Sequence, residues 1–138
     1  MSNSAPAERR RALLAAHYAV ENAHHLDGIM RTFAAEGEMV YNRQPFGDGE
    51  AIRAAHVYIG FAGDGAFAGL ETLIDAQHLT AEEIVVEGRL RGRHVGEFQG
   101  FAPSGREVEL PFVGFYRFAA DGGLVSERIV MNLGVLAS

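Results

Sequence analysis

Residues 92–118 read GRHVGEFQGFAPSGREVELPFVGFYRF, and the turn ADGG at 120–123 and an apolar run to Leu136 follow at once. Large apolar residues alternate with polar ones through this stretch, which is the period of half-buried strands. The Pro-Ser-Gly at 103–105 and the Asp-Gly-Gly at 121–123 are typical of hairpin turns. The stretch therefore predicts three consecutive antiparallel strands.

The same period extends upstream and changes to helical spacing near the N-terminus. We expect long strands at 70–79, 83–95, 106–118 and 124–136, and a short strand at 38–42. Apolar residues recur at three- and four-residue spacing in three segments, which predicts helices at 7–23, 25–35 and 50–59. The glycine-rich residues 61–69 also carry two phenylalanines, so we expect a mobile loop that could act as a lid.

Helices at the front of the chain and a long antiparallel sheet behind them predict an α+β domain. One face of a curved sheet has to be covered by the helices, which leaves a pocket between the two layers. The 138 residues, 48% of them hydrophobic, are enough for one core. Residues 1–138 are therefore expected to form a single domain, with 1–7 as a flexible tail.

Composition narrows the class of partner. The net charge is -6 and the only basic cluster is at 9–11, which argues against nucleic-acid binding and a membrane-binding surface. The absence of cysteine excludes disulfides and thiolate metal sites. The chain shows no secretory signal and no apolar stretch near the roughly 20 residues that span a bilayer. We expect a cytoplasmic protein that binds a small molecule or another protein.

Four phrases carry a family resemblance: NAHHLDGI at 22–29, RHVGEF at 93–98, PSGR at 103–106 and DGGL at 121–124. With the order of the elements, they resemble the SnoaL-like polyketide cyclases of the nuclear-transport-factor-like superfamily. The resemblance runs from about residue 10 to 136. It implies a cone-shaped α+β fold with an internal pocket, no cofactor, and a small hydrophobic, cyclic substrate or ligand.

The catalytic positions of the family are changed in this chain. The acid/base aspartate of the cyclases matches Asn132, whose amide cannot take or give that proton. The catalytic groups of ketosteroid isomerase match His17, residues 41–43 and Gly114, and none is retained. Those of limonene epoxide hydrolase fall on His94, Gly96 and Asn132. Both of these mechanisms are disfavoured.

A polar constellation remains at those positions. The resemblance and the strand period place six residues in the pocket: His17, Tyr41, Asn42, His94, Arg128 and Asn132. His94 and His17 are the candidate general bases because only histidine titrates near neutral pH. Arg128 would stabilise an enolate and Asn132 would orient the substrate carbonyl. Substrate-binding walls are expected from Tyr41, Asn42, Phe112, Gly114 and Tyr116.

Several of these candidates, and other polar residues of the chain, also have a purely structural interpretation. His17 fits a hydrogen-bonded core histidine, and His94 fits a brace for its hairpin. A shift of one residue in register would turn Arg128 to solvent and bring Glu127 and Ile129 inside. His24, His25 and Asp27 suggest a metal site, but adjacent helical residues point about 100° apart, so we expect no metal. The surface or sheet-edge residues are expected to include His56, His78, Glu82 and Glu83.

Three functions stay open. The first is a cofactor-free cyclase, isomerase or lyase that acts on an aromatic or polyketide-like ketone by aldol or enolisation chemistry. The second is a non-catalytic domain that binds a small hydrophobic molecule. The third, an epoxide hydrolase-like enzyme, lacks an obvious carboxylate to activate water. Because the strands carry apolar residues on both faces, we also expect a homodimer.

Overall fold

The computed structural model describes residues 4–63 and 65–137. Its helices are α1 (Ser4–Asn22), α2 (Leu26–Arg31), α3 (Gly49–Ile59) and a short 3-10 helix, η1 (Leu133–Leu136). Its strands are β1 (Phe33–Tyr41), β2 (Gln44–Phe46), β3 (Phe67–Leu79), β4 (Glu83–His94), β5 (Glu107–Phe118) and β6 (Leu124–Met131). The described helices include none that is both long and apolar enough to cross a membrane.

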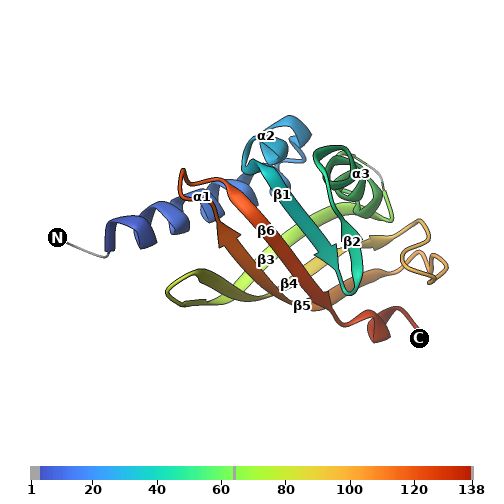
Figure 1. The fold of residues 1–138 in the computed structure, drawn as a ribbon. Coiled ribbons are helices and arrows are strands. Elements are labelled where there is room, and N and C mark those ends of the chain that lie inside the picture. The colour runs from blue at the N-terminus through green and yellow to red at the C-terminus, as the bar shows by residue number, and fades with distance from the viewer. Residues whose placement is uncertain (1–3, 64, 138) are drawn as a thin grey trace.

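All six strands form one curved sheet in the order β2-β1-β6-β5-β4-β3. The expected meander is confirmed, since β3, β4, β5 and β6 pair in sequence as antiparallel neighbours. β1 returns to the sheet beside β6 and runs parallel to it. Figure 1 shows the three α-helices gathered on one side of the sheet, so the predicted α+β architecture is confirmed.

The core lies between the helices and the inner face of the sheet. Alternate residues of the central strands are buried there, including Ile84, Val86 and Leu90 from β4 and Leu110 and Phe112 from β5. Each such side chain contributes about 1.5–3 kcal/mol by leaving water. This period-two burial explains why the strand prediction was correct for the central strands.

The second helix is shorter than the sequence predicts. The helix was expected over 25–35, but α2 ends at Arg31 and β1 begins at Phe33. The backbone carbonyl of Thr32 accepts a hydrogen bond from the amide of Leu124 at 2.9 Å, and Phe33 pairs with the same residue. Pairing with a strand far downstream in the sequence therefore overrides the local helical pattern.

Two other boundaries differ from expectation. β2 lies between the expected strand at 38–42 and the expected helix at 50–59, and it pairs with β1 through a tight turn at Asn42, whose φ is 53°. The last strand was expected to reach residue 136, but β6 ends at Met131. Asn132 then caps η1, because its Oδ1 accepts the amide of Gly134 at 3.0 Å.

The expected tail and loop are also more ordered than predicted. α1 begins at Ser4, so residues 4–7 are helical, while residues 1–3 lie outside the described part of the chain. In the expected 61–69 loop, Phe61 and Phe67 are both buried, and β3 already begins at Phe67. Position 64 is outside the described residues.

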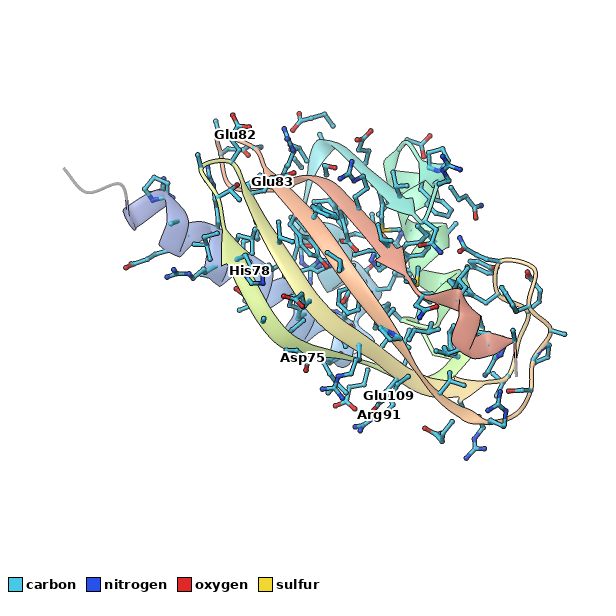
Figure 2. All side chains as sticks on the ribbon, turned by 90° about the horizontal axis from the view of Figure 1, so that it is seen from below. Asp75, His78, Glu82, Glu83, Arg91 and Glu109 are labelled. Atoms are coloured by element: carbon cyan, nitrogen blue, oxygen red, sulfur yellow. The ribbon has the colours of Figure 1, made fainter. Side chains whose placement is uncertain are left out.

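The outer face and edge of the sheet carry charged side chains (Figure 2). Cross-strand ion pairs join Arg91 to Glu71 at 2.6 Å and Arg89 to Asp75 at 2.8 Å. His78 was expected at the surface and is exposed there. Exposed pairs of this kind contribute only about 0–1 kcal/mol, so the buried inner face dominates stability.

Candidate functional site

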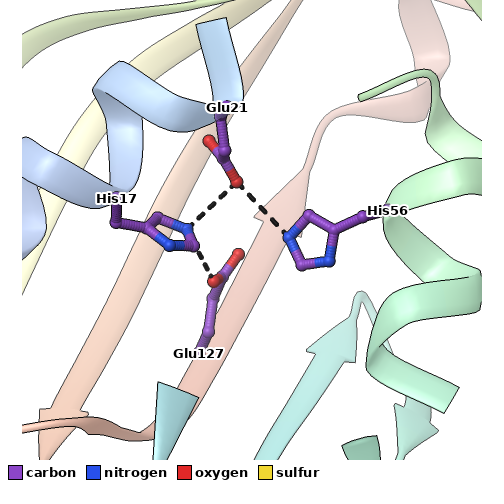
Figure 3. Close-up of side chains that lie close together, drawn as sticks. All are labelled: His17, Glu21, His56 and Glu127. Carbon is purple, nitrogen blue, oxygen red and sulfur yellow. Dashed lines mark ion pairs between the residues drawn. The ribbon is translucent and has the colours of Figure 1, made fainter. Parts of the chain in front are cut away.

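Four ionisable side chains meet inside the protein (Figure 3). His17 and Glu21 lie one turn apart on α1, His56 comes from α3 and Glu127 from β6. Their side chains are between 0% and 5% exposed. Nε2 of His17 lies 3.0 Å from Oε2 of Glu21 and 3.1 Å from Oε1 of Glu127. We call these four residues the inner cluster.

The protonation state of His17 follows from its hydrogen-bond partner and from the charged groups beside it. Thr32 donates its hydroxyl proton to the carbonyl of Ile29 at 2.6 Å, so it can only accept from Nδ1 of His17, 2.8 Å away. Burial alone would lower the pKa of His17, but the carboxylates of Glu21 and Glu127 outweigh burial and raise this pKa to about 10. His17 is therefore an imidazolium at neutral pH, with both ring nitrogens protonated.

Glu21 contacts both histidines of the inner cluster and Thr72. Its Oε1 accepts a hydrogen bond from the hydroxyl of Thr72 at 3.2 Å, and its Oε2 faces His17. Burial would raise the pKa of Glu21, but the positive charge of His17 overrides burial and lowers it. Glu21 is therefore ionised at neutral pH.

His56 lies on the buried stripe of α3 with Ile52, Ala55 and Ile59. Its Nδ1 donates a hydrogen bond to the carbonyl of Ile52 at 2.8 Å, because a carbonyl oxygen can only accept one. Nε2 is 3.5 Å from Oε2 of Glu21 and has no hydrogen-bond partner among the described residues. In a neutral ring, this nitrogen presents a lone pair to the carboxylate.

A small cavity adjoins the two carboxylates of the inner cluster. Its volume is about 20 Å³, which is room for an ordered water molecule and not for a ring. Its walls consist of two carboxylates, five aromatic residues and smaller side chains: Glu21, Glu127, Tyr18, Tyr41, Phe61, Phe112, Tyr116, Ile59, Thr72, Leu90 and Ile129. Burial raises the pKa of all three tyrosines, so their hydroxyls stay protonated hydrogen-bond donors.

The expected wall residues fall in or near this cavity. Tyr41, Phe112 and Tyr116 line it. Gly114 is buried on the same strand face, but a Cβ there would lie 2.6 Å from the ring of Tyr116 and 3.1 Å from Ile129. The space beside Gly114 is therefore filled by the Tyr116 ring and is not open floor, as the sequence suggested.

The expected placement of Arg128 and Asn132 in the pocket is wrong. Arg128 is exposed, with its guanidinium carbon 4.8 Å from the centroid of the Phe115 ring, and Asn132 is exposed at the cap of η1. The pairing of β5 with β6 shifts between Arg117 and Phe118, after which the buried face holds Glu127. A local irregularity thus reverses which residues face inward, as the register alternative allowed.

Asn42 holds the backbone together beside the cavity. Its Oδ1 accepts the amide of Met131 at 2.6 Å, and its own amide group lies 3.4 Å from Gln99. Asn42 does not line the cavity. Its contacts are those of a turn residue that ties β1 to β6.

His94 is buried but lies apart from the cavity walls. Its ring stacks on Phe67 with centroids 5.1 Å apart, and neither ring nitrogen has a hydrogen-bond partner among the described residues. Its backbone accepts the amide of Gly105 at 2.8 Å, at the hairpin it was expected to brace. The structure thus brings His17 to the cavity region but not His94.

Two members of the inner cluster, Glu21 and His56, were not predicted to lie there, and Glu127 was named only as the register alternative. Glu21 follows His17 by four residues on a helix, a spacing that places both on one face. His56 was expected at the surface, although Ile52 and Ile59 place it on the apolar side of α3. Glu127 carried a weaker signal, which depended on the register of β6.

Solved structures with similar folds come from several bacteria. A candidate SnoaL-like polyketide cyclase from Jannaschia sp. CCS1 has a TM-score of 0.79 and 21% identity over 94% of this chain and 90% of that one. IdmH, a candidate polyketide cyclase from Streptomyces antibioticus, has a TM-score of 0.74 and 17% identity over 93% and 95%. SalBIII, described as an epoxide hydrolase/cyclase-like enzyme in pyran ring formation, has a TM-score of 0.76 and 11% identity over 93% and 94%.

At these identities the structural likeness concerns the fold alone. No curated protein matches the sequence. A family model described as a SnoaL-like domain matches residues 14–127, which is well over half of the chain. The predicted resemblance is therefore confirmed, and the chain belongs to the SnoaL-like domain family.

Proposed function

We propose that this protein is an enzyme that acts on a small cyclic or polyketide-like ketone by acid/base chemistry through an enolate. One observation carries the proposal. Oε1 of Glu127 and the hydroxyl of Tyr18 belong to walls of the same cavity, and neither makes a hydrogen bond of acceptable geometry within the described residues. Glu127 is ion-paired with His17 at 3.1 Å, but a buried acceptor and a buried donor whose hydrogen bonds are incomplete still suit a substrate that supplies both partners.

In this mechanism the carboxylate of Glu127 removes a proton from the carbon next to the ketone. The hydroxyl of Tyr18 donates a hydrogen bond to the oxygen that gains negative charge. Glu127 then returns the proton, either to another carbon in an isomerisation or to the alkoxide oxygen after an aldol ring closure. His17 acts as a positioning residue, because its Nε2 lies 3.1 Å from Oε1 of Glu127.

The two histidines favoured from the sequence suit the role of base less well. Both ring nitrogens of His17 carry protons, for the reasons given above. His94 is not among the residues that line the cavity. Carbon-proton abstraction therefore fits Glu127 better than either histidine.

A ring-sized substrate needs more room than the cavity offers. About 20 Å³ is available, so a wall residue has to move when the substrate enters. Phe61 is the best candidate, because it lies in the glycine-rich connection between α3 and β3. The backbone there includes Gly60 and Gly63 with φ of 129° and 92°. We propose that displacement of Phe61 opens the site.

Proton exchange tests the proposal directly. The protein is incubated in D₂O with a panel of cyclic ketones and 1,3-diketones, and NMR follows loss of the α-proton signal. We expect Glu127→Gln to slow exchange about 10²–10⁴-fold and Tyr18→Phe to slow it about 10²–10³-fold. An exposed carboxylate of β1, Glu38, provides the control, and Glu38→Gln should exchange at the wild-type rate.

Two results would contradict this function. One is exchange that survives Glu127→Gln in a folded variant. The other is tight binding of a ketone from the panel with no exchange and no product, which would favour a domain that binds a small molecule without transforming it.

A second candidate function is addition of water to an epoxide. The specific observation in its favour is a cavity of one-water size against the carboxylates of Glu21 and Glu127. SalBIII, described as epoxide hydrolase/cyclase-like, is the structural relative in line with this chemistry. Incorporation of ¹⁸O from labelled water into a diol would identify this reaction, and its absence would leave the enolate mechanism.

We further propose that the protein forms a homodimer through the outer face of the sheet. Val130 is 53% exposed on that face. Phe115 is half-buried there under the guanidinium of Arg128. Apolar side chains in this position favour contact with a second copy.

A further inference from the structure

We propose that His17, Glu21, His56 and Glu127 together bind one divalent transition-metal ion such as Zn²⁺. The proposal does not rest on the enolate mechanism, because it concerns what the inner cluster binds and not what reaction follows. It also differs from the metal site suggested by His24 and His25 in the sequence. Nε2 of His24 instead contacts the carbonyl of Leu70 at 2.7 Å.

The ligand atoms converge to within the span of a metal site. One atom from each of the four side chains lies within 4.8 Å of the other three. The closest separations are 3.0 Å, 3.1 Å and 3.5 Å. A tetrahedral ion with bonds of about 2.1 Å requires ligand atoms roughly 3.4 Å apart. The two shortest separations would open slightly and the wider ones would close to complete the coordination.

The histidines are held in the tautomer that a metal ion requires. Nδ1 of His17 donates to Thr32 at 2.8 Å, and Nδ1 of His56 donates to the carbonyl of Ile52 at 2.8 Å. Both rings therefore direct Nε2 toward the carboxylates. In a metal-binding histidine, the ring nitrogen that does not bind the metal almost always donates a hydrogen bond in this way.

The first carboxylate is oriented in the same manner. The hydroxyl of Thr72 donates to Oε1 of Glu21 at 3.2 Å, which leaves Oε2 toward His17 and His56. Three of the four ligands are thus fixed by a neighbour outside the cluster. Such outer contacts hold metal ligands in place before the ion binds.

Without an ion, the contacts inside the cluster are incomplete. Nε2 of His17, Nε2 of His56 and Oε1 of Glu127 are buried, and none has a hydrogen-bond partner of acceptable geometry among the described residues. The contacts of His17 with the two carboxylates are short, at 3.0 Å and 3.1 Å, but do not meet the geometry of a hydrogen bond. Buried polar atoms without partners are rare and costly. One cation at the centre would satisfy all of them.

The charges of the four side chains also favour a bound cation. Two carboxyl groups and two imidazoles share an interior that is 5% exposed or less. Buried ionisable groups are costly unless their charges are balanced. A divalent cation with two neutral imidazoles and two carboxylates sums to zero. Two imidazole nitrogens and two carboxylate oxygens also suit Zn²⁺, Co²⁺ or Fe²⁺ better than Ca²⁺ or Mg²⁺.

Metal binding and the enolate mechanism describe two states of one cluster. The ion would take the place of the Nε2 proton of His17 and would occupy the oxygen of Glu127. Binding therefore releases protons and weakens in acid. Failure to bind metal leaves the enolate mechanism untouched, and failure of proton exchange leaves the metal site untouched.

The test uses full-length protein stripped with a chelator, dialysed against Zn²⁺ and analysed for metal by mass spectrometry. We expect one ion per chain, a melting temperature that rises with Zn²⁺ concentration, and visible absorption from a low-symmetry site when Co²⁺ is used. Thr32→Val leaves all four ligands in place and should weaken affinity about 10–100-fold. His56→Gln removes a ligand and should weaken affinity further.

The matched control is His78→Gln, because His78 also contacts a glutamate, at 2.7 Å, but on the surface. It should keep full metal affinity. Absence of stoichiometric Zn²⁺ and of the Co²⁺ spectrum in the wild type would overturn the proposal, whether or not any variant folds. Unchanged affinity in folded His56→Gln and Thr32→Val proteins would overturn it too, since the ion would then lie elsewhere.

Discussion

Nε2 of His17 on α1 lies 3.1 Å from Oε1 of Glu127 on β6, with both side chains 3% exposed or less. This buried contact joins the first helix to the last strand of the sheet. Removing His17 takes the cationic partner from both buried carboxylates, whereas removing Glu127 leaves His17 still 3.0 Å from Glu21. We therefore expect His17→Gln to lower the free energy of unfolding by about 3–5 kcal/mol and Glu127→Gln to lower it by less. Urea titration of each variant measures this loss.

The double variant and a surface pair provide the control. His17→Gln with Glu127→Gln should cost less than the sum of the single changes, with a coupling of about 0.5–3 kcal/mol. Arg91 and Glu71 are closer together, at 2.6 Å, but nearly half exposed. Their removal should cost no more than about 1 kcal/mol. Additive losses at His17 and Glu127 would show that the two side chains do not interact.

Stability of the metal-free protein should have a broad plateau in pH. The pKa of His17 is raised from 6.5 to about 10, so its contribution is complete below 6.5 and disappears as pH rises through about 10. The pKa of Glu21 is lowered from 4.5, so its contribution is complete above 4.5 and disappears as pH falls through the lower value. Unfolding between pH 2 and pH 11 with a chelator present would trace both limits.

An NMR titration separates His17 from the other histidines. Its ring signals should not move between about pH 5 and pH 8, because the effect of burial is outweighed by the carboxylates of Glu21 and Glu127, which raise its pKa to about 10. A midpoint near 6.5 for His17 would mean that the ring is not an imidazolium held between two carboxylates.

The sequence was sufficient to predict the α+β architecture and its meander, because both depend on repeated local patterns. Alternating residues in β4 and β5 and turn residues between them specify the meander without knowledge of distant contacts. The end of α2 could not be found this way, since Phe33 is drawn into β1 by pairing with Leu124. The parallel alignment of β1 and β6 likewise leaves no local signal.

The inner cluster was only partly predictable for the same reason. His17 was identified, and Glu21 one turn later was available from helical spacing. Glu127 was named only as the alternative for a shifted register, because the irregularity between β5 and β6 changes the inward face within a single strand. A prediction that assumed unbroken alternation placed Arg128 inside and could not have found the shift. The two-residue period of a strand shows which side chains share a face, but it shows which of the two faces is buried only when the register is known.

Gly114 should be intolerant of even one methyl group. A Cβ there would lie 2.6 Å from Cε2 and 3.0 Å from the hydroxyl of Tyr116, a ring that lines the cavity. Gly114→Ala is therefore expected to lower stability by about 1–3 kcal/mol and to displace Tyr116. Chemical denaturation gives the first effect, and a crystal structure of the variant gives the second.

Gly47 is the matched glycine, since a Cβ at Gly47 meets nothing within 4 Å. Gly47→Ala should stay within about 0.5 kcal/mol of the wild type. Equal effects at the two glycines would mean that the space beside Gly114 is not filled by Tyr116.

The outer face of the sheet should hold the dimer together. Wild-type protein is expected to sediment at twice the chain mass of 14.9 kDa. Val130→Glu places a charge on β6, where the side chain is 53% exposed, and should shift the protein to monomer. Val57→Glu is the control because Val57 is 43% exposed on α3, in the helical layer. A monomeric wild type, or monomers from both variants, would contradict an interface on this face.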